Sequence, residues 1–159
     1  MDALLKLIQN NARLTTEEMA AMLDISEDQV CEKLRSYEEN GTILGYQTVV
    51  NEDKLDLDLV RAVIEIRITP ERDGGFNKLA ERIAKYSEVR SCYLMSGGYD
   101  LLVIVEGTSL REVASLVSEK LATMHGVLST STHFLLKPYK ENGILMQPEK
   151  PHERLPVTP

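Results

Sequence analysis

The sequence predicts an α+β fold with two domains, an N-terminal tri-helical helix-turn-helix domain and a C-terminal ferredoxin-like βαββαβ domain with an antiparallel four-stranded sheet. Apolar residues recur at helical spacing through residues 2–41, and from residue 60 onward strand-like and helix-like patterns alternate. The order strand, helix, strand, strand, helix, strand is the split βαβ arrangement, which places both helices on one face of the sheet. We expect the helical domain at 1–45, a linker with a strand at 46–58, the sheet domain at 59–141 and an extended Pro-rich tail at 142–159.

The segment 14–41 is typical of two short helices joined by a tight turn. Thr15 or Thr16 is placed to cap the first helix, because a hydroxyl there accepts an unpaired backbone N–H of the first turn. Ser26 is a second expected cap, and the acidic residues behind it suit the positive end of the helix dipole. Gly41 is the expected stop of the second helix. Any αα-hairpin in a small bundle would show the same pattern, so this segment alone leaves both interpretations open.

The remaining elements follow from local periodicity. A first helix is expected at 2–10, a strand leaving the helical domain at 43–50, and a polar connection at 51–58. In the second domain we expect strands at 60–69, 90–96, 99–106 and 128–137, with helices at 76–86 and from Ser109 to Met124. The segment 69–75 should end the first strand, and Gly97-Gly98 indicates a hairpin.

The sheet face opposite the helices is also expected to be apolar. A sheet that is apolar on both faces, with helices on only one, needs a partner to cover the other face. Two-fold pairing of identical sheets is the simplest cover, so we expect a dimer or a larger assembly. The side chains expected on this face are Val63, Tyr93, Met95, Leu102, Ile104 and, depending on register, Phe134 or Leu135.

Composition and charge exclude several classes of protein. The chain has no Trp and two Phe, so broad aromatic platforms for stacking bases are not expected. Cys31 and Cys92 are far apart, which excludes a disulfide scaffold, an iron–sulfur ferredoxin and a zinc finger and suits a reducing cytosol. No apolar run is long enough to cross a bilayer, and the first residues lack the basic start of a signal peptide. We therefore expect a cytoplasmic protein without a membrane contact.

The residue pattern does not favour an enzyme. His125, His133 and His152 have no metal-ligand spacing among themselves, and no nucleophile–base set is present. The hydroxyl run 129–132 either consists of ordinary strand residues or supplies hydrogen bonds to a ligand. Gly97-Gly98 joins two strands and so does not match a phosphate-binding loop before a helix. We expect no catalytic residues, no cofactor and no metal.

Several motifs occur in a specific order along residues 1–141. The segment 4–26 (LLKLIQNNARLTTEEMAAMLDIS) and the spacing of Ser26, Val30, Lys33, Leu34 and Glu38 resemble the helices of the Lrp/AsnC, or feast/famine, family of prokaryotic transcription regulators. The exit 39–46 (ENGTILGY) and the segment 96–107 (SGGYDLLVIVEG) resemble that family's Glu-Gly-Val-Ile-x-Gly-Tyr and Gly-x-Tyr-Asp motifs. Gly126-Val127, followed by Thr130 and Thr132, is similar to the start of its last strand.

The resemblance implies a regulator of amino-acid or related metabolism that binds DNA and is modulated by a small effector. It implies homodimers that assemble to tetramers or octamers, with an effector, typically an amino acid, between dimers. In this interpretation Asp100 pairs with the effector's ammonium group and the backbone N–H groups of Gly97 and Gly98 receive its carboxylate; the alternative is that Asp100 only ties down the hairpin. The effector-binding residues implied by position are Gly97, Gly98, Tyr99, Asp100, Thr130 and Thr132.

The helix-turn-helix departs from the family in its charge. Residues 1–45 carry four basic and nine acidic residues, a net charge of −5, whereas DNA affinity depends largely on neutralised phosphates. Gln29 would approach bases, and Lys33 and Arg35 would reach phosphates. An alternative is an oligomeric ligand-sensing module with lost or weak DNA binding that acts through a protein partner. The DNA-binding residues implied by position are Thr15, Thr16, Ser26, Gln29, Lys33 and Arg35.

Overall fold

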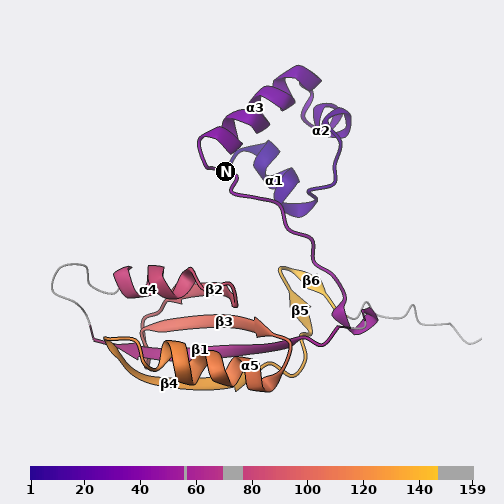
Figure 1. Cartoon of the computed structure of the whole chain (residues 1–159). Helices are drawn as coiled ribbons and strands as arrows, with labels where there is room; N and C mark the ends of the chain where they lie inside the picture. Colours follow the sequence, from indigo (N-terminus) through magenta and orange to yellow (C-terminus); the bar gives the residue numbers. More distant parts are fainter. Residues whose placement is uncertain (56, 70–76, 147–159) are drawn as a thin grey trace, which may run out of the picture. The chain divides into compact units, whose positions relative to one another are not determined.

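The computed structural model describes residues 1–55, 57–69 and 77–146, and it divides the chain into two compact units (Figure 1). The N-terminal unit comprises Met1–Val50, and the C-terminal unit begins at Asn51. The fold class predicted from the sequence is confirmed, since a three-helix unit precedes a mixed unit with a four-stranded antiparallel sheet.

The N-terminal unit consists of helices α1 (Ala3–Asn10), α2 (Thr16–Leu23) and α3 (Glu27–Glu39) around a small core. Leu4, Met19, Ala20 and Val30 are buried at its centre, so each helix contributes to it. Helices of this length are marginal in isolation, and this shared apolar face is what holds them. Around the centre pack Ile8, Leu14, Leu23, Ile25, Leu34 and Tyr37.

The helix ends follow the predicted capping pattern. Thr15, rather than Thr16, caps α2: its Oγ1 accepts from the Glu18 N–H at 3.1 Å, while the Thr15 N–H donates to Glu18 Oε2 at 2.8 Å. Ser26 caps α3 in the same reciprocal way with Gln29. Asp24 ends α2 in the left-handed conformation with φ 54°, which turns the chain sharply into α3. Gly41, with φ 73°, follows the end of α3 as expected.

The strand predicted at 43–50 is wrong, because these residues have no regular secondary structure. Their β-branched and aromatic composition suits a strand, but a strand also needs a neighbouring backbone to pair with, and none pairs with this segment in the described part of the chain. Leu44 is 94% exposed, and Tyr46 Oη donates to Glu38 Oε1 at 2.9 Å. In the connection predicted at 51–58, a short 3₁₀ turn, η1, covers Glu52–Lys54.

The C-terminal sheet has the strand order β2-β3-β1-β4, with every neighbouring pair antiparallel (Figure 1). Helix α4 lies between the first two strands in sequence, and α5 continues into the π-helical segment η2 between the last two. Residues 70–76, where the sequence predicts the break after the first strand and the start of a helix, lie outside the described residues. The bounds are β1 Val60–Ile68, α4 Asn77–Ala84, β2 Val89–Leu94, β3 Leu101–Gly107, α5 Leu110–Ser115, η2 Leu116–Leu121 and β4 Val127–Phe134.

One face of the sheet carries the core of this unit. Alternate residues of β1 and β3 point to this face and are buried against α4, α5 and η2, so both helices cover the same side, as predicted. The buried residues are Ala62, Ile64, Ile66, Ile68, Leu79, Ile83, Leu101, Val103, Val105, Val113, Leu116, Leu121 and Met124.

The opposite face, called here the open face, is only partly apolar. Val63 lies opposite Ile104 and His133, and Glu65 lies opposite Leu102 and Ser131. Phe134 pairs with Ala62 and is therefore on the helix side, whereas the next residue, Leu135, belongs to the open face. The prediction of an apolar face missed the charged side chains at alternate positions, which are Arg61, Glu65, Arg67 and Glu106.

A two-stranded hairpin, β5 (Lys140–Glu141) and β6 (Ile144–Leu145), spans the predicted boundary between the sheet domain and the extended tail. Asn142 and Gly143 both have positive φ, 47° and 85°, which is the Asn-Gly type I′ turn of tight hairpins. The tail prediction is therefore wrong for residues 142–146, and its remainder, 147–159, lies outside the described residues.

The two cysteines differ in their surroundings. Cys31 is exposed on α3, whereas Cys92 in β2 is half-buried with its Sγ 3.9 Å from the Ala80 carbonyl oxygen. Burial raises the pKa of the Cys92 thiol, so it is less ready to ionise.

Candidate functional site

A small hollow of about 190 Å³ lies where the β2–β3 turn meets strands β1 and β4. Three separate segments supply its walls, and their order in the sheet brings them together. It is lined by Glu65, Arg67, Gly98, Tyr99, Ser129, Thr130 and Ser131.

Hydrogen bonds hold the β2–β3 turn against the end of β1. Arg67 Nε donates to the Gly98 carbonyl oxygen at 2.7 Å. The Asp100 N–H donates to the Ile66 carbonyl at 3.0 Å, and Asp100 Oδ2 accepts from the Ile68 N–H at 2.8 Å. The turn is therefore fixed at three points before any ligand binds, which lowers the ordering cost of binding there.

The hollow presents opposite charges on one face of a single strand. Glu65 and Arg67 are alternate residues of one strand, so they share a face and their Cα atoms are roughly 7 Å apart. Glu65 Oε1 lies 3.6 Å from His133 Nε2, and Ser131 Oγ lies 3.3 Å from the same nitrogen. Arg67 is exposed, and because Gly98 engages its Nε, the terminal nitrogens of the guanidinium can still donate to a second acceptor.

The structure brings together some of the sequence-predicted effector residues and not others. Gly98 and Tyr99 line the hollow, and Gly97 lies in the same turn. Thr130 also lines it, but it pairs with the buried Ile66, so its side chain points to the helix side and its backbone is what the hollow meets. Asp100 does not line it, because its carboxylate is directed to the β1 backbone. Thr132 pairs with Ile64 and so points to the helix side.

Sequence analysis missed Glu65 and Arg67 as site residues. Their alternation with the buried Ile64, Ile66 and Ile68 already places them together on the opposite face, and this pattern was the available indication. Their nearness to the turn and to β4 depends on the strand order, which the residue pattern alone does not supply.

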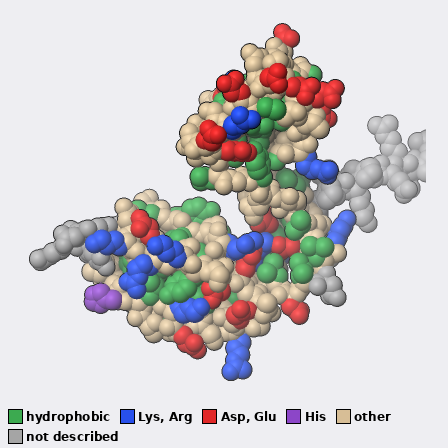
Figure 2. Space-filling model, turned by 45° about the horizontal axis from the view of Figure 1, so that its top comes forward, with side chains coloured by type: hydrophobic (Ala, Val, Ile, Leu, Met, Phe, Trp, Pro, Cys, Tyr) green, Lys and Arg blue, Asp and Glu red, His purple; other side chains and the backbone are tan. Residues whose placement is uncertain are grey.

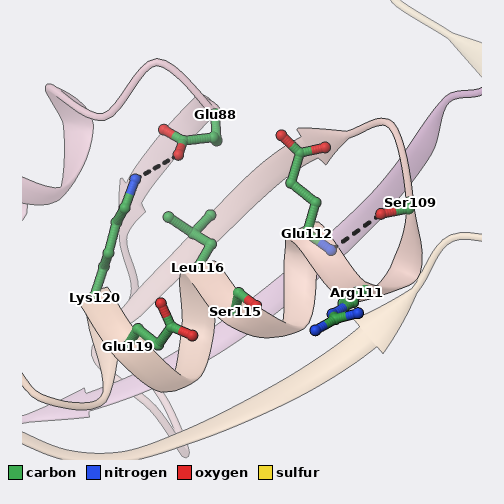
Figure 3. A pocket seen from close by; sticks show the side chains of 8 residues that line it. All are labelled: Glu88, Ser109, Arg111, Glu112, Ser115, Leu116, Glu119 and Lys120. Atoms are coloured by element: carbon green, nitrogen blue, oxygen red, sulfur yellow. Dashed lines mark hydrogen bonds and ion pairs between the residues drawn. The ribbon is translucent and has the colours of Figure 1, made fainter.

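A larger hollow of about 400 Å³ lies over α5 and η2 (Figure 3). Its charged groups largely satisfy one another: Lys120 Nζ lies 2.6 Å from Glu88 Oε1, and Glu112 Oε2 accepts from both Thr108 N–H and Oγ1. The hydrogen bond from Lys120 lowers the pKa of Glu88 to about 2. Figure 3 shows Lys120 reaching Glu88 beside Leu116, and the Glu112 N–H donating to Ser109 Oγ. We assign no ligand to it.

The side chains predicted to bind DNA are partly engaged within the N-terminal unit. Gln29 Oε1 accepts from the Ser26 N–H at 3.0 Å, so bidentate contact with adenine requires this cap to open. Lys33 Nζ lies 3.3 Å from Asp2 Oδ2, a link between α3 and α1. Thr16 Oγ1 donates to Glu27 Oε2 at 3.4 Å, while Arg35 is exposed.

Acidic side chains dominate the surface of this unit. Figure 2 shows them gathered over the helices, with few basic side chains among them. The first turn of α3 holds Glu27 and Asp28, at the end of the helix that enters the major groove in helix-turn-helix proteins. Long-range attraction to DNA is therefore weak, and binding has to depend on short-range contacts or on several units at once.

Two further observations concern the described residues alone. They contain no group of three or more His, Cys, Asp or Glu placed to hold a metal ion. None of their helices is both long and apolar enough to cross a membrane.

A helix-turn-helix unit followed by a ferredoxin-like sheet with a small polar hollow defines the class of ligand-responsive, DNA-binding transcription regulators. The sequence profile described as Lrp/AsnC ligand binding domain matches residues 61–145, the part that builds the sheet. The chain belongs to the Lrp/AsnC family, and its function is effector-modulated regulation of transcription through DNA binding.

Relatives and solved structures agree with this assignment. The chain is 38% identical over 157 residues to the HTH-type transcriptional regulator YugG of Bacillus subtilis (strain 168), covering 98% of this chain and 95% of that protein. It is 25% identical over 139 residues to the leucine-responsive regulatory protein of Escherichia coli (strain K12), covering 87% and 84%. A transcriptional regulator of Neisseria meningitidis, solved as an L-Met complex, superposes with a TM-score of 0.70 at 26% identity, covering 89% and 93%.

Proposed function

We propose that the effector of this regulator is a free α-amino acid bound in the 190 Å³ hollow, with its two charged groups facing Arg67 and Glu65. The observation that supports the proposal is the placement of opposite charges two residues apart on one strand face beside a pre-positioned turn. Gly97, Gly98, Tyr99 and the backbone of Thr130 complete the proposed contacts.

The charge geometry fits a zwitterion. An α-amino acid holds its carboxylate and ammonium on neighbouring atoms, and each forms a charge-assisted hydrogen bond of about 2.8 Å. Glu65 and Arg67 are neighbours on one strand face, with Cα atoms roughly 7 Å apart, so their long side chains can reach the two charged groups of one such molecule. Arg67 receives the carboxylate and Glu65 the ammonium, a role that the sequence had suggested for Asp100. The hydroxyls of Ser129 and Ser131 supply further donors and acceptors.

Calorimetry with a panel of the common amino acids tests the effector class. We expect Arg67→Gln and Glu65→Gln each to weaken binding of the tightest amino acid about tenfold or more, because each removes a charge-assisted hydrogen bond. Arg82→Gln on α4, which also removes an Arg but lies outside the hollow, is the matched control and should bind as the parent does. Equal affinities in all four proteins would reject this site.

We propose that α3 enters the major groove of DNA with its N-terminal half. Gln29 approaches base edges after release from its cap, and Arg35 and Lys33 contact phosphates. The residues that lie near the DNA backbone are Thr15, Thr16 and Ser26. The exposed Arg35 supports this assignment, and the Asp2 partner of Lys33 weakens it, since that ion pair has to open first.

A second candidate is favoured by the acidic α3: an oligomeric sensing module that acts through a protein partner. The DNA-binding role and the protein-partner role are distinguished by measuring how the protein binds DNA fragments from its own gene's upstream region. The measurement is made at two salt concentrations, with and without the amino acid that binds most tightly. DNA binding that weakens as the salt concentration rises and that responds to the amino acid supports the DNA-binding role. Absence of binding at low salt by an intact oligomer supports the protein partner.

We propose that the open face forms a two-fold dimer interface and that dimers assemble further, to tetramers or octamers. Half-buried Val63, Leu102 and Ile104 and exposed Tyr93 and Leu135 supply its apolar area. Several weakly binding helix-turn-helix units on one assembly then act together on DNA. The protein works in the cytoplasm as a regulator and not as an enzyme.

A further inference from the structure

Arg61, at the start of β1, joins three segments that are far apart in the sequence. Its Nε donates to Glu106 Oε1 of β3 at 2.6 Å, and its Nη1 lies 3.3 Å from Glu141 Oε2 of β5. Its Nη2 donates to Glu52 Oε1 of η1. Each nitrogen of the guanidinium therefore faces a carboxylate from a different element, a geometry that the planar fork of Arg permits and the single ammonium of Lys does not.

The cluster is partly shielded from solvent, and Arg61 is its central positive charge. The side chains of Arg61 and Glu106 are 16% and 17% exposed, and Arg90 Nε pairs with the second oxygen of Glu106 at 2.7 Å. Burial alone would lower the pKa of Arg61, but the hydrogen bond to Glu106 and the three carboxylate charges raise it, so the guanidinium stays protonated. Without it, three carboxylates would face one another in a half-buried site.

η1 and the residues after it have polar and apolar contacts of their own. Leu55, Leu57 and Leu59 are exposed by 46%, 59% and 36%, so apolar burial anchors these residues only in part. Asn51 Nδ2 donates to the Met146 carbonyl at 3.4 Å, which ties this segment to the β5–β6 hairpin (Figure 1). The Arg61–Glu52 ion pair is a direct side-chain attachment of the described connection to β1.

We propose that Arg61 is a positioning residue that couples the effector hollow to the connection leading into the helix-turn-helix unit. Arg61, Glu65 and Arg67 lie on the same face of one rigid strand, so a displacement of β1 by an effector also moves Arg61 and the Glu52–Lys54 segment. The coupling rests on the proposed effector function, whereas the anchoring role stands without it.

Hydrogen exchange of the ligand-free full chain tests the anchoring. Glu52→Gln removes only the connection's ion pair and should make the Lys54 and Leu55 amides exchange about tenfold faster, while the β1–β3 ladder is unchanged. Glu141→Gln should do the same for the Met146 amide of the β5–β6 hairpin. Glu88→Gln, which breaks an ion pair outside this cluster, is the control and should affect neither. Unchanged exchange in Glu52→Gln would overturn the anchoring.

The coupling has a separate readout. In Glu52→Gln the affinity for the effector should stay within about twofold of the parent, because Glu52 lies outside the hollow, while the effector-induced change in DNA affinity should fall at least about tenfold. A full response in this variant would overturn the coupling. A parent protein that binds no amino acid would contradict the proposed function and the coupling together, and the exchange measurement would still decide the anchoring.

Discussion

The role that a single residue can play in this protein depends on which of its polar atoms already form hydrogen bonds within the chain. Asp100 belongs to the motif that first suggested an effector contact, yet one of its oxygens accepts from the β1 backbone. Gln29 is placed to meet bases, yet its carbonyl oxygen closes a helix cap. Gln29 therefore combines a structural role with the proposed functional one, so a substitution there removes both, whereas Asp100 has only the structural role in the proposed site.

The Glu88–Lys120 ion pair should give stability a specific pH dependence. The hydrogen bond from Lys120 lowers the pKa of Glu88 from 4.5 to about 2 in the folded protein, so the deprotonated form favours folding. This contribution is fully present above the unfolded value and is lost as the pH falls from about 4.5 through about 2. At pH 7 we expect Glu88→Gln to be less stable by under about 1 kcal/mol, as for other exposed pairs.

Urea unfolding of the parent and of Glu88→Gln between pH 7 and pH 3 measures this difference. The gap in the free energy of unfolding should narrow steadily below about pH 4.5. Lys120→Gln breaks the same ion pair from the other side and should show the same trend. A gap that stays constant down to pH 3 would contradict the assignment.

At the scale of elements, α3 carries the test of DNA binding. We expect Lys33→Ala combined with Arg35→Ala to weaken binding to every DNA sequence and to flatten the dependence of log affinity on log salt by about 0.9 for each phosphate that is no longer neutralised. Fluorescence anisotropy at several salt concentrations gives the slope. Lys6→Ala on α1, an exposed Lys on another helix, is the control, and an unaltered slope in the double variant would place the phosphate-binding residues elsewhere.

Elements that depend only on residues close to one another in the chain were predictable from the sequence. The Ser26 cap and the first strand of the sheet, observed as Val60–Ile68, depend on neighbours close in the chain, and both predictions are confirmed. The segment 43–50 failed because strand composition does not supply a pairing partner. The β5–β6 strands have two residues each, too short for a period, although Asn142-Gly143 was an available indication.

The candidate site was predictable only in part, for a related reason. Gly98, Tyr99 and Thr130 were named from their motifs, and they do line the hollow. Glu65 and Arg67 join them because β1 lies between β3 and β4, and this adjacency is a property of the sheet order. The π-helical continuation of α5 had no indication in the apolar spacing, which a regular α-helix would satisfy as well.

At the scale of the whole molecule, the open face should decide the assembly. We expect Ile104→Glu to raise the dissociation constant of the dimer about a hundredfold, because it places an unpaired charge at the centre of the proposed interface. Sedimentation over a range of concentrations measures the constant. Leu110→Glu, at a 59% exposed site on α5, is the control, and an unchanged dimer in Ile104→Glu would place the interface on another surface.

The two cysteines differ in exposure, so one of them can be labelled selectively for measurements of distance between protomers. Cys31 is exposed on α3, while Cys92 is half-buried and its thiol is harder to ionise, so a brief treatment with a spin-labelled maleimide modifies Cys31 first. In an assembly, every helix-turn-helix unit then carries one paramagnetic probe without any engineered residue. Electron-spin distances recorded with and without an amino acid would report how far the effector moves these units apart.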